Sequence, residues 1–261
     1  MARSTDHVAE TATLIEAAGA HALPLIADVT DLQAVDHAVE RIEQWLGPID
    51  ILINNAAVCG PIGPLWEVDP DEWTRTMDVN MRGTFVCARA VLPGMVARRR
   101  GCIVNVASHA GVYRWPQVSG YAVSKAAVIK FTENLAVETR HTGVAVFALH
   151  PGTVPAGMGE DLLSADVPGD SHVGHVASWF RQQFALGRGV PPERAGELVV
   201  TLASGRADAL SGRYLTAYDD LAELIGRAAE IRRDDLYTLR LRELDPAQHS
   251  RANMSRSGSV Q

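Results

Sequence analysis

A tyrosine and a lysine stand four residues apart in the segment Tyr121-Ala-Val-Ser-Lys125. On a helix this spacing places both side chains on one face, with their Cβ atoms about 5–6 Å apart. A lysine ammonium near a phenol favours the phenolate and should lower the tyrosine pKa from about 10 towards neutrality. Such a tyrosine can protonate an alkoxide or deprotonate an alcohol. The spacing therefore predicts an acid–base pair, although an ordinary pair on a helix surface would have the same spacing.

The composition of the chain strengthens the functional interpretation of this pair. Of the 24 basic residues only Lys125 and Lys130 are lysines, so a lysine four residues after a tyrosine is unusual in this chain. Arginine is not an equivalent substitute for lysine here, because its planar guanidinium differs from an ammonium group in geometry and hydration. The lysine is therefore expected to have a specific role.

The elements that must position this pair alternate between helix and strand. Apolar runs predict strands at 22–29, 49–56, 102–108, 144–150 and 213–217. Helical spacing predicts helices at 4–18, 30–47, 70–99, 120–140, 191–204 and 219–233, with a short one near 175–184. Thr30 is expected to cap the second helix through a capping box with Gln33. Apolar strands separated by helices indicate an α/β fold of three layers, a doubly wound (Rossmann) parallel sheet covered on both faces.

Ligands of such sheets bind beyond the carboxyl ends of the strands. The residues directly after the predicted strands are therefore candidates for the site: Asp28, Asn54, Asn55, Ser108 and the pair Pro151-Gly152.

Composition and charge exclude several other classes of protein. The 261 residues are 47% hydrophobic and 21% charged, as in globular proteins, and the formal charge of −7 gives no basic excess for nucleic acid. The run Arg98-Arg99-Arg100 ends a predicted helix, where cations are favoured anyway. No apolar run is long enough to cross a membrane. Three scattered cysteines favour a cytoplasmic protein, and no metal site is expected, even from His172 and His175.

Five motifs in order resemble the short-chain dehydrogenase/reductase family over about residues 1–217. They are Asn54-Asn55-Ala56-Ala57, Asp78-Val79-Asn80, Asn105-Val106-Ala107-Ser108, Tyr121-x-x-x-Lys125 and Pro151-Gly152. The resemblance implies oxidation of a secondary alcohol, or reduction of a ketone or aldehyde, by hydride transfer with NADP or NAD.

The resemblance also implies a catalytic set of Ser108, Tyr121, Lys125 and Asn80. Tyr121 would be the general acid/base, and Ser108 would bind the substrate oxygen. Lys125 would lower the pKa of Tyr121 and bind the nicotinamide ribose. Asn80 would hold, through its backbone carbonyl oxygen, a water that links Lys125 to solvent. A bend in the helix is the alternative interpretation of Asn80, and a cap at the strand end is that of Ser108.

Cofactor contacts follow from the same resemblance. Asp28 and Val29 would contact the adenine, Asn54 and Ala56 the adenine ribose, and Pro151, Gly152 and Val154 the nicotinamide, beside Tyr121 and Lys125. Asn55 is expected to brace the sheet instead. The threonine that the family usually has after the Pro-Gly turn is Ala156 here, which removes one expected contact, and Thr153 is an uncertain substitute. Arg3 would suit the 2′-phosphate of NADP, which favours NADP over NAD.

The front of the chain departs from the family pattern. No Thr-Gly-x-x-x-Gly-x-Gly turn, which would bind the cofactor pyrophosphate, occurs in the sequence. The fold is therefore expected to lack about one β-α-β unit at the N-terminus, with a gap of roughly 14 Å between the strands at 22–29 and 49–56. Either the start given lies downstream of the true one, or the chain is a truncated, catalytically impaired family member that acts only by binding or oligomerisation.

The remaining expectations concern substrate, assembly and domains. The substrate pocket is expected to be lined by His109, Trp115 and Met158. These residues favour a hydrophobic alcohol or ketone as the substrate. The long helices at 70–99 and 120–140 would form a homodimer or homotetramer, as is common in the family. The catalytic domain is expected over 1–217, a helical extension over 218–244 and a tail over 245–261.

Overall fold

The computed structural model describes residues 1–242, so the tail predicted at 245–261 lies outside the described residues. Its central sheet has four parallel strands in the order β1-β2-β3-β4. The strands are β1 (Ile51–Asn54), β2 (Gly101–Val106), β3 (Val144–His150) and β4 (Tyr214–Thr216). The parallel Rossmann-like sheet predicted from the apolar runs is thereby confirmed.

The helices follow the predicted order closely. They are α1 (Thr5–Ala17), α2 (Leu32–Leu46), α3 (Pro70–Met77), α4 (Gly83–Arg98), α5 (Ser119–Glu138), α6 (Met158–Ser164), α7 (His172–Ala185), α8 (Pro192–Ala203), α9 (Leu221–Gly226) and α10 (Ala228–Arg233). The structure differs from the prediction in that α6 was not expected and the helix predicted at 219–233 is two short helices. The helix predicted at 70–99 contains a π-helical segment, Asp78–Arg82, between α3 and α4.

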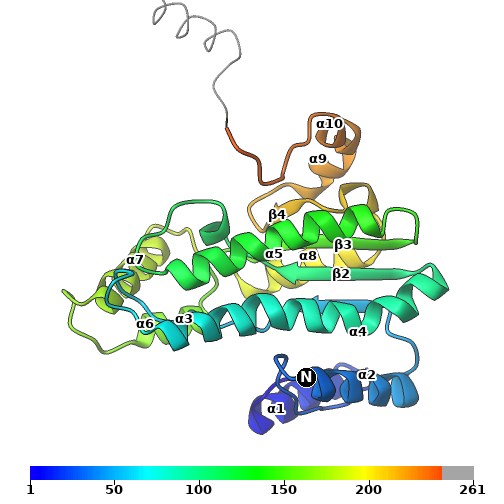
Figure 1. Cartoon of the computed structure of the whole chain (residues 1–261), viewed down its shortest axis with the longest axis horizontal. Coiled ribbons are helices and arrows are strands. Elements are labelled where there is room, and N and C mark those ends of the chain that lie inside the picture. Colours follow the sequence, from blue (N-terminus) through cyan, green and yellow to red (C-terminus); the bar gives the residue numbers. More distant parts are fainter. Residues whose placement is uncertain (243–261) are drawn as a thin grey trace, which may run out of the picture.

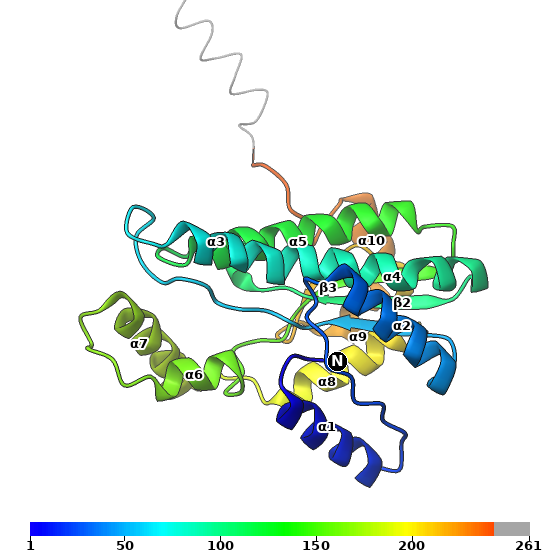
Figure 2. The same cartoon turned by 60° about the horizontal axis from the view of Figure 1, so that its bottom comes forward.

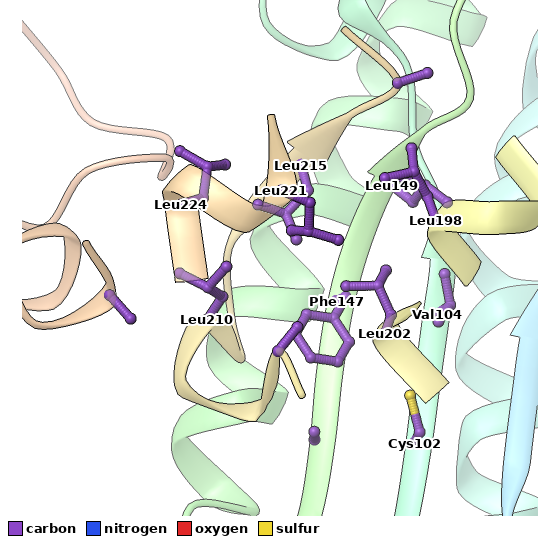
Figure 3. Packing of buried hydrophobic residues seen from close by; sticks show 14 of the residues in the cluster. Cys102, Val104, Phe147, Leu149, Leu198, Leu202, Leu210, Leu215, Leu221 and Leu224 are labelled. Carbon is purple, nitrogen blue, oxygen red and sulfur yellow. The ribbon is translucent and has the colours of Figure 1, made fainter. Parts of the chain in front are cut away.

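Helices cover both faces of the sheet, as the apolar strands require (Figures 1 and 2). On one face α4 and α5 pack on the sheet, where Met95 and Leu135 meet Ile103 and Val146. On the other face α8 and α9 pack on β2, β3 and β4. Phe147 lies at the centre of this second core, next to Leu202 of α8 (Figure 3). The three layers hold the carboxyl ends of β2 and β3 rigidly at one edge of the sheet.

The segment 22–29 does not form the strand that its apolar pattern predicts. Its pairing within the described residues is a single parallel bridge between Ile26 and Ala2, in which Ala27 donates to the Ala2 carbonyl oxygen over 3.1 Å. A β-ladder needs a partner strand that runs alongside for several residues. Within residues 1–242 this segment pairs with one residue alone, Ala2. The outer edge of β1 has no partner strand in residues 1–242, and its side chains Ile51 and Ile53 are 47% and 46% exposed.

The cap of α2 is Asp31 and not Thr30. The Asp31 carboxylate accepts from the backbone N–H groups of Gln33 and Ala34, over 2.9 and 3.1 Å. Thr30 is turned the other way, and its hydroxyl donates to Asp28 over 2.8 Å. The predicted N-cap was therefore wrong by one residue. Aspartate caps a helix as well as threonine does, and the Thr30 hydroxyl is already engaged in its hydrogen bond to Asp28.

Candidate active site

A cavity of about 780 Å³ lies at the carboxyl ends of β2 and β3. Nine of the predicted site residues line it: Ser108, His109, Trp115, Tyr121, Lys125, Pro151, Gly152, Val154 and Met158. The other six, Arg3, Asp28, Val29, Asn54, Ala56 and Asn80, lie outside this cavity. The structure thus brings the predicted catalytic and nicotinamide residues together, apart from Asn80.

Tyr121 and Lys125 lie on one face of α5, as their spacing requires. The ammonium nitrogen of Lys125 lies 5.7 Å from the centre of the Tyr121 ring and donates to the Val106 carbonyl oxygen at 2.7 Å. Burial lowers the pKa of Lys125 to about 8. Burial also raises the pKa of Tyr121 to about 12, against the opposing effect of a hydrogen bond with Ser108.

The pKa of Tyr121 therefore moves opposite to the direction expected from its spacing with Lys125. The lysine is not among the groups that shift it. The ammonium meets the face of the ring, and its hydrogen bond is made to the backbone. A spacing of four residues brought the two side chains together but did not determine which atoms would face each other.

Ser108 ends the loop after β2 and is buried beside Tyr121. Its hydroxyl accepts from the backbone N–H of Ala110 over 3.2 Å, which caps the 3-10 turn His109–Gly111. The hydrogen bond with Tyr121 places the two hydroxyl groups side by side. Both interpretations of Ser108, strand-end cap and substrate ligand, are therefore compatible with its position.

Asn80 lies in the π-helical segment between α3 and α4, where it is fully buried. Its side-chain amide exchanges two hydrogen bonds with the backbone of Val58, over 2.8 and 2.9 Å, and donates to the Ser124 hydroxyl. Its carbonyl oxygen accepts from the Thr84 hydroxyl at 2.8 Å. Asn80 therefore ties the loop after β1 to α5, and it lies where the helix departs from regular α-helical hydrogen bonding.

Asn54 and Asn55 have exchanged the side-chain roles expected of them. The Asn54 side chain is buried and donates to the Asn105 side chain of β2 over 2.8 Å, while Asn105 donates to Thr132 of α5. Asn55 is exposed and lines the large cavity. The sheet is thus braced by Asn54, which leaves only the backbone of Asn54 for a ribose contact.

Arg3 and Asp28 lie together at the end of the segment 22–29. Their charged groups are 4.0 Å apart, and both are partly exposed. The Asp28 carboxylate accepts from the backbone N–H and hydroxyl of Thr30, over 2.9 and 2.8 Å. The backbone hydrogen bond from Thr30 is the main reason why the pKa of Asp28 lies below its usual value. The carboxylate is thus ionised and held in place at neutral pH.

The turn after β3 needs glycine at position 152. Gly152 has φ +86°, and a Cβ there would lie 2.4 Å from a methyl carbon of Val190. Thr153 follows, and its backbone N–H donates to the Tyr218 hydroxyl over 3.0 Å, while its carbonyl oxygen accepts from Val190. The turn is therefore fixed against the loop that precedes α8 and presents a rigid wall to the cavity.

Comparison with known proteins shows the family to which the chain belongs. The family model described as short chain dehydrogenase matches residues 1–166, well over half of the chain. The chain belongs to the short-chain dehydrogenase family. A curated relative, the short chain dehydrogenase mpl6 of Monascus purpureus, is 35% identical over 245 residues, which cover 92% of this chain and 78% of the relative.

Solved structures of the family have the same fold as this short-chain dehydrogenase. Levodione reductase has a TM-score of 0.75 at 28% identity, covering 87% of this chain and 86% of its own. A gluconate 5-dehydrogenase from Burkholderia cenocepacia, solved with NADP and tartrate, has a TM-score of 0.72 at 27% identity and covers 85% of this chain and 83% of its own. The relatives are dehydrogenases and reductases, so the chain is a member of an oxidoreductase family.

The far wall of the dehydrogenase's cavity is aromatic. Trp115 packs against Trp179 and Phe180 of α7, with ring centroids 5.2 and 6.0 Å apart. Met158 begins α6 on the same side. Two of the three predicted substrate residues, Trp115 and Met158, thus belong to an apolar wall of the cavity. The helices α6 and α7 form the rest of this wall.

Two residues of the cavity were not singled out from the sequence. His150 ends β3 and lies against His109 with the two rings tilted by 36° and their centroids 4.1 Å apart, and its buried Nδ1 has no hydrogen-bond partner among residues 1–242. Burial is the main reason why the pKa of His150 falls to about 3. Cys59 lies in the apolar cluster that contains Tyr121. The sequence did contain a signal for His150. It is a polar residue at the end of an apolar strand, directly before Pro151-Gly152, and this position indicates a place in the site.

Two further searches concern metals and membranes. No group of three His, Cys, Asp or Glu side chains within residues 1–242 is arranged to hold a metal ion. Within the same range, no helix is both long and apolar enough to cross a membrane.

Proposed function

We propose that this chain interconverts an alcohol, a secondary alcohol in the first place, and the corresponding ketone or aldehyde by hydride transfer with a nicotinamide cofactor, using Ser108, Tyr121, Lys125 and Asn80. The observation that supports this most is the convergence of Ser108, Tyr121 and Lys125 on one cavity of about 780 Å³. The cavity lies where doubly wound sheets bind their ligands, beyond the carboxyl ends of the strands.

Tyr121 is the proton donor in the direction of carbonyl reduction. With a pKa of about 12 the phenol holds its proton at neutral pH, so it can give the proton to a carbonyl oxygen that gains charge. Ser108, whose hydroxyl lies beside that of Tyr121, donates a second hydrogen bond to the same oxygen. In alcohol oxidation the same phenol must first lose its proton, which requires a cation closer to its oxygen.

Lys125 and Asn80 support Tyr121 from α5 and from the π-helical segment. Lys125, with a pKa near 8, keeps most of its positive charge at neutral pH in a buried position. A cation favours a nearby phenolate, so this charge would assist loss of the phenol proton if the ammonium moved from the face of the ring towards the Tyr121 oxygen. Asn80 fixes Ser124, one residue before Lys125, by a hydrogen bond of 2.9 Å. Asn80 is therefore a positioning residue for the lysine.

The cavity fits the nicotinamide end of the cofactor. Pro151, Gly152 and Val154 form a rigid wall beside Tyr121 and Lys125, and the cavity has both apolar faces and polar groups. A nicotinamide bound there supplies or accepts the hydride. Arg3 and Asp28 would hold the adenosine end, and the exposed guanidinium of Arg3 favours NADP over NAD. The gluconate 5-dehydrogenase with NADP is in keeping with this preference.

The substrate is a hydrophobic alcohol or ketone held between the catalytic residues and the aromatic wall. Trp115 and Met158 supply apolar contacts, and His109 lies next to Ser108 with a pKa lowered by burial, so it is neutral at pH 7. A neutral imidazole can hydrogen-bond a second polar group of the substrate.

We also propose a homodimer or homotetramer in the cytoplasm, with no nucleic-acid or membrane partner. The exposed apolar side chains of α4 and α5 support an oligomer: Phe85, Val123 and Val137 are 46%, 47% and 66% exposed. Exposed apolar patches of this kind are typical of protein interfaces.

A second candidate function is binding without efficient turnover. It is favoured by the unpaired outer edge of β1 in residues 1–242 and by the absence of a glycine-rich phosphate turn from the 261 residues. Without that turn the pyrophosphate loses its main backbone donors. The same cavity would then hold a carbonyl compound without transferring hydride to it.

One experiment separates the two candidates. The 261-residue chain is assayed with a panel of secondary alcohols and ketones at millimolar NADPH, NADP, NADH or NAD, and oxidation state is followed by nicotinamide absorbance. We expect turnover that Tyr121→Phe lowers by about 100-fold or more, while nucleotide binding stays within about twofold. Absence of any Tyr121-dependent turnover would overturn the first candidate in favour of the second.

A further inference from the structure

Another cavity, of about 420 Å³, shares His109 and Tyr113 with the first cavity but is not lined by Tyr121. Its wall contains the side chains of four tyrosines and one aspartate, and we call it the tyrosine pocket. Its defining residues are His109, Tyr113, Tyr214, Tyr218, Asp219 and Tyr237. The chain has five tyrosines, so every one except the proposed catalytic Tyr121 lines this pocket. Its volume lies within the range of roughly 300–1,000 Å³ typical of small-molecule sites.

The aromatic rings of the tyrosine pocket surround the imidazole of His109. The His109 ring meets Tyr113 edge-on with centroids 5.4 Å apart and stacks on Tyr218 at 5.8 Å. Tyr214 lies at 6.2 Å from it. These separations are within the contact range of aromatic pairs, so the rings form a continuous π surface.

The only formally charged side chain in the wall of the tyrosine pocket is the carboxylate of Asp219. Its Oδ2 accepts from the backbone N–H of Thr216 over 2.7 Å, which holds it in place at the end of β4. Burial lowers the pKa of His109, so the imidazole adds no positive charge at neutral pH. Tyr214 has a buried hydroxyl with no partner in the described residues, and burial raises its pKa. The wall therefore carries net negative charge.

Of the arginines close to the pocket, Arg194 donates to the backbone carbonyl oxygens of Ala217 and Asp219 and lies 3.6 Å from Glu197. Two others are paired with carboxylates outside the pocket wall. Arg213 lies 2.9 Å from Asp235, and Arg240 lies 2.6 Å from both Asp235 and Glu133. The Leu239 backbone N–H also donates to Glu133 over 2.6 Å, and this fixes the segment that closes the outer wall. The pocket is thus a fixed space with aromatic faces and one uncompensated carboxylate.

We propose that the tyrosine pocket binds a small organic cation, a substituted ammonium, by cation–π contact with the tyrosines and ion pairing with Asp219. The faces of aromatic rings carry negative charge and attract such cations, the more so when the site excludes water. An anionic ligand would be repelled by the carboxylate, and a neutral ligand could gain a hydrogen bond from it but no ion pair. Because His109 lines both cavities, the occupant lies beside the proposed active site, yet its binding needs neither nucleotide nor turnover.

The test compares one cation with its neutral carbon analogue. Choline and 3,3-dimethylbutan-1-ol have the same shape and differ in the charge of the central atom. Both are titrated into the 261-residue chain without nucleotide, and binding is measured by calorimetry and by saturation-transfer NMR. We expect choline to bind at least about tenfold more tightly, because a partly desolvated cation–π contact and one ion pair together supply that factor.

Two matched pairs of variants locate the site. Tyr113 is 66% exposed, so replacing it should not disturb the core. Tyr113→Leu should weaken choline binding by about two- to fivefold, whereas Tyr113→Phe, which keeps the ring, should leave it within about twofold. Asp219→Asn should weaken it by about fivefold or more, while Asp6→Asn on the exposed face of α1 makes the same change in net charge and should have no effect.

The proposal is overturned by any of three results. They are equal affinity for choline and its neutral analogue, no choline binding at millimolar concentration, and equal binding by the Tyr113→Leu and Tyr113→Phe variants. The Tyr113 pair decides the matter even if Asp219→Asn fails to fold. Since no catalytic step is measured, failure here leaves the proposed oxidoreductase activity unaffected.

Discussion

The ammonium nitrogen of Lys125 lies 5.7 Å from the centre of the Tyr121 ring, and its hydrogen bond goes to the Val106 carbonyl oxygen. The lysine therefore acts from the face of the ring and is anchored to β2. A buried ammonium in such a position is costly, which is why the pKa of Lys125 falls to about 8. Its retention in a chain with only two lysines supports a role in the chemistry of Tyr121.

Replacement of this lysine by arginine should abolish most of the activity. In Lys125→Arg the larger planar guanidinium cannot occupy the same space between the ring and Val106, so we expect turnover to fall by about 100-fold. The matched control is Lys130→Arg, in which the partly exposed pair with Glu133, 2.8 Å apart, can re-form. Turnover above half of the wild-type value in Lys125→Arg would contradict the role of the lysine.

The reversed roles of Asn54 and Asn55 give a prediction about stability. Asn54→Ala leaves the buried Asn105 side chain without its donor, and we expect the free energy of unfolding to fall by about 1–3 kcal/mol. Asn55→Ala removes an exposed side chain from the cavity wall and should change it by less than about 0.5 kcal/mol. Urea unfolding of the two variants measures both values, and equal losses would argue against Asn54 as the brace.

Much of the fold could be predicted because several local sequence patterns are each compatible with one kind of structure. The apolar runs that became β2 and β3 are buried on both faces, and such strands occur in parallel sheets covered by helices. Pro70 after Asp69 marked the start of α3, where the Asp69 carboxylate indeed accepts from two backbone N–H groups. The large cavity followed as well, since it depends on where the strands end.

The parts that could not be predicted depend on side-chain direction or on distant partners. Which of Asn54 and Asn55 turns inward depends on the register of β1 against β2, where Asn54 faces Asn105. The segment 22–29 has a strand-like composition, yet a strand requires a neighbour, and the sequence pattern does not report one. The tyrosine pocket combines residues more than 100 positions apart, Tyr113 and Tyr237, so no local pattern could indicate it.

The buried imidazole of His150 predicts a loss of stability in acid. Burial, together with positive charge on His109 and Lys125, lowers its pKa from 6.5 to about 3 in the folded chain. Between these two values the unfolded chain binds an extra proton, so the contribution is fully present above about pH 6.5 and is lost as the pH falls towards 3. Between pH 7 and 4.5 this costs the folded chain about 2–3 kcal/mol.

A neutral replacement isolates this contribution from other titrating groups. His150→Gln cannot gain the proton, so its free energy of unfolding should fall less than that of the wild type between pH 7 and 4.5, by the amount given above. His141→Gln, a change at an exposed histidine, should follow the wild-type curve. Parallel curves for the wild type and His150→Gln would show that His150 titrates normally.

The position of Arg3 leads to a prediction about the preference for NADPH over NADH and about the strength of nucleotide binding. Its guanidinium is 53% exposed and 4.0 Å from Asp28, so it is free to approach a 2′-phosphate. Arg3→Gln should therefore weaken NADPH binding by about tenfold or more, since a charged hydrogen bond contributes about 1.5 kcal/mol or more, and leave NADH binding within about twofold. Calorimetric titration of both nucleotides with both proteins measures the effect.

The same titration tests how tightly these 261 residues hold a pyrophosphate, since no Thr-Gly-x-x-x-Gly-x-Gly segment occurs among them. Backbone N–H groups at a helix N-terminus are the usual donors to a pyrophosphate, and this chain of 261 residues has no such turn after its first strand-like segment. The affinity for NADPH should therefore be weaker than about 1 μM even with Arg3 present. Sub-micromolar binding would mean that other backbone groups hold the pyrophosphate. An equal loss of NADH and NADPH binding in Arg3→Gln would place the arginine away from the 2′ position, because only NADPH carries a phosphate there.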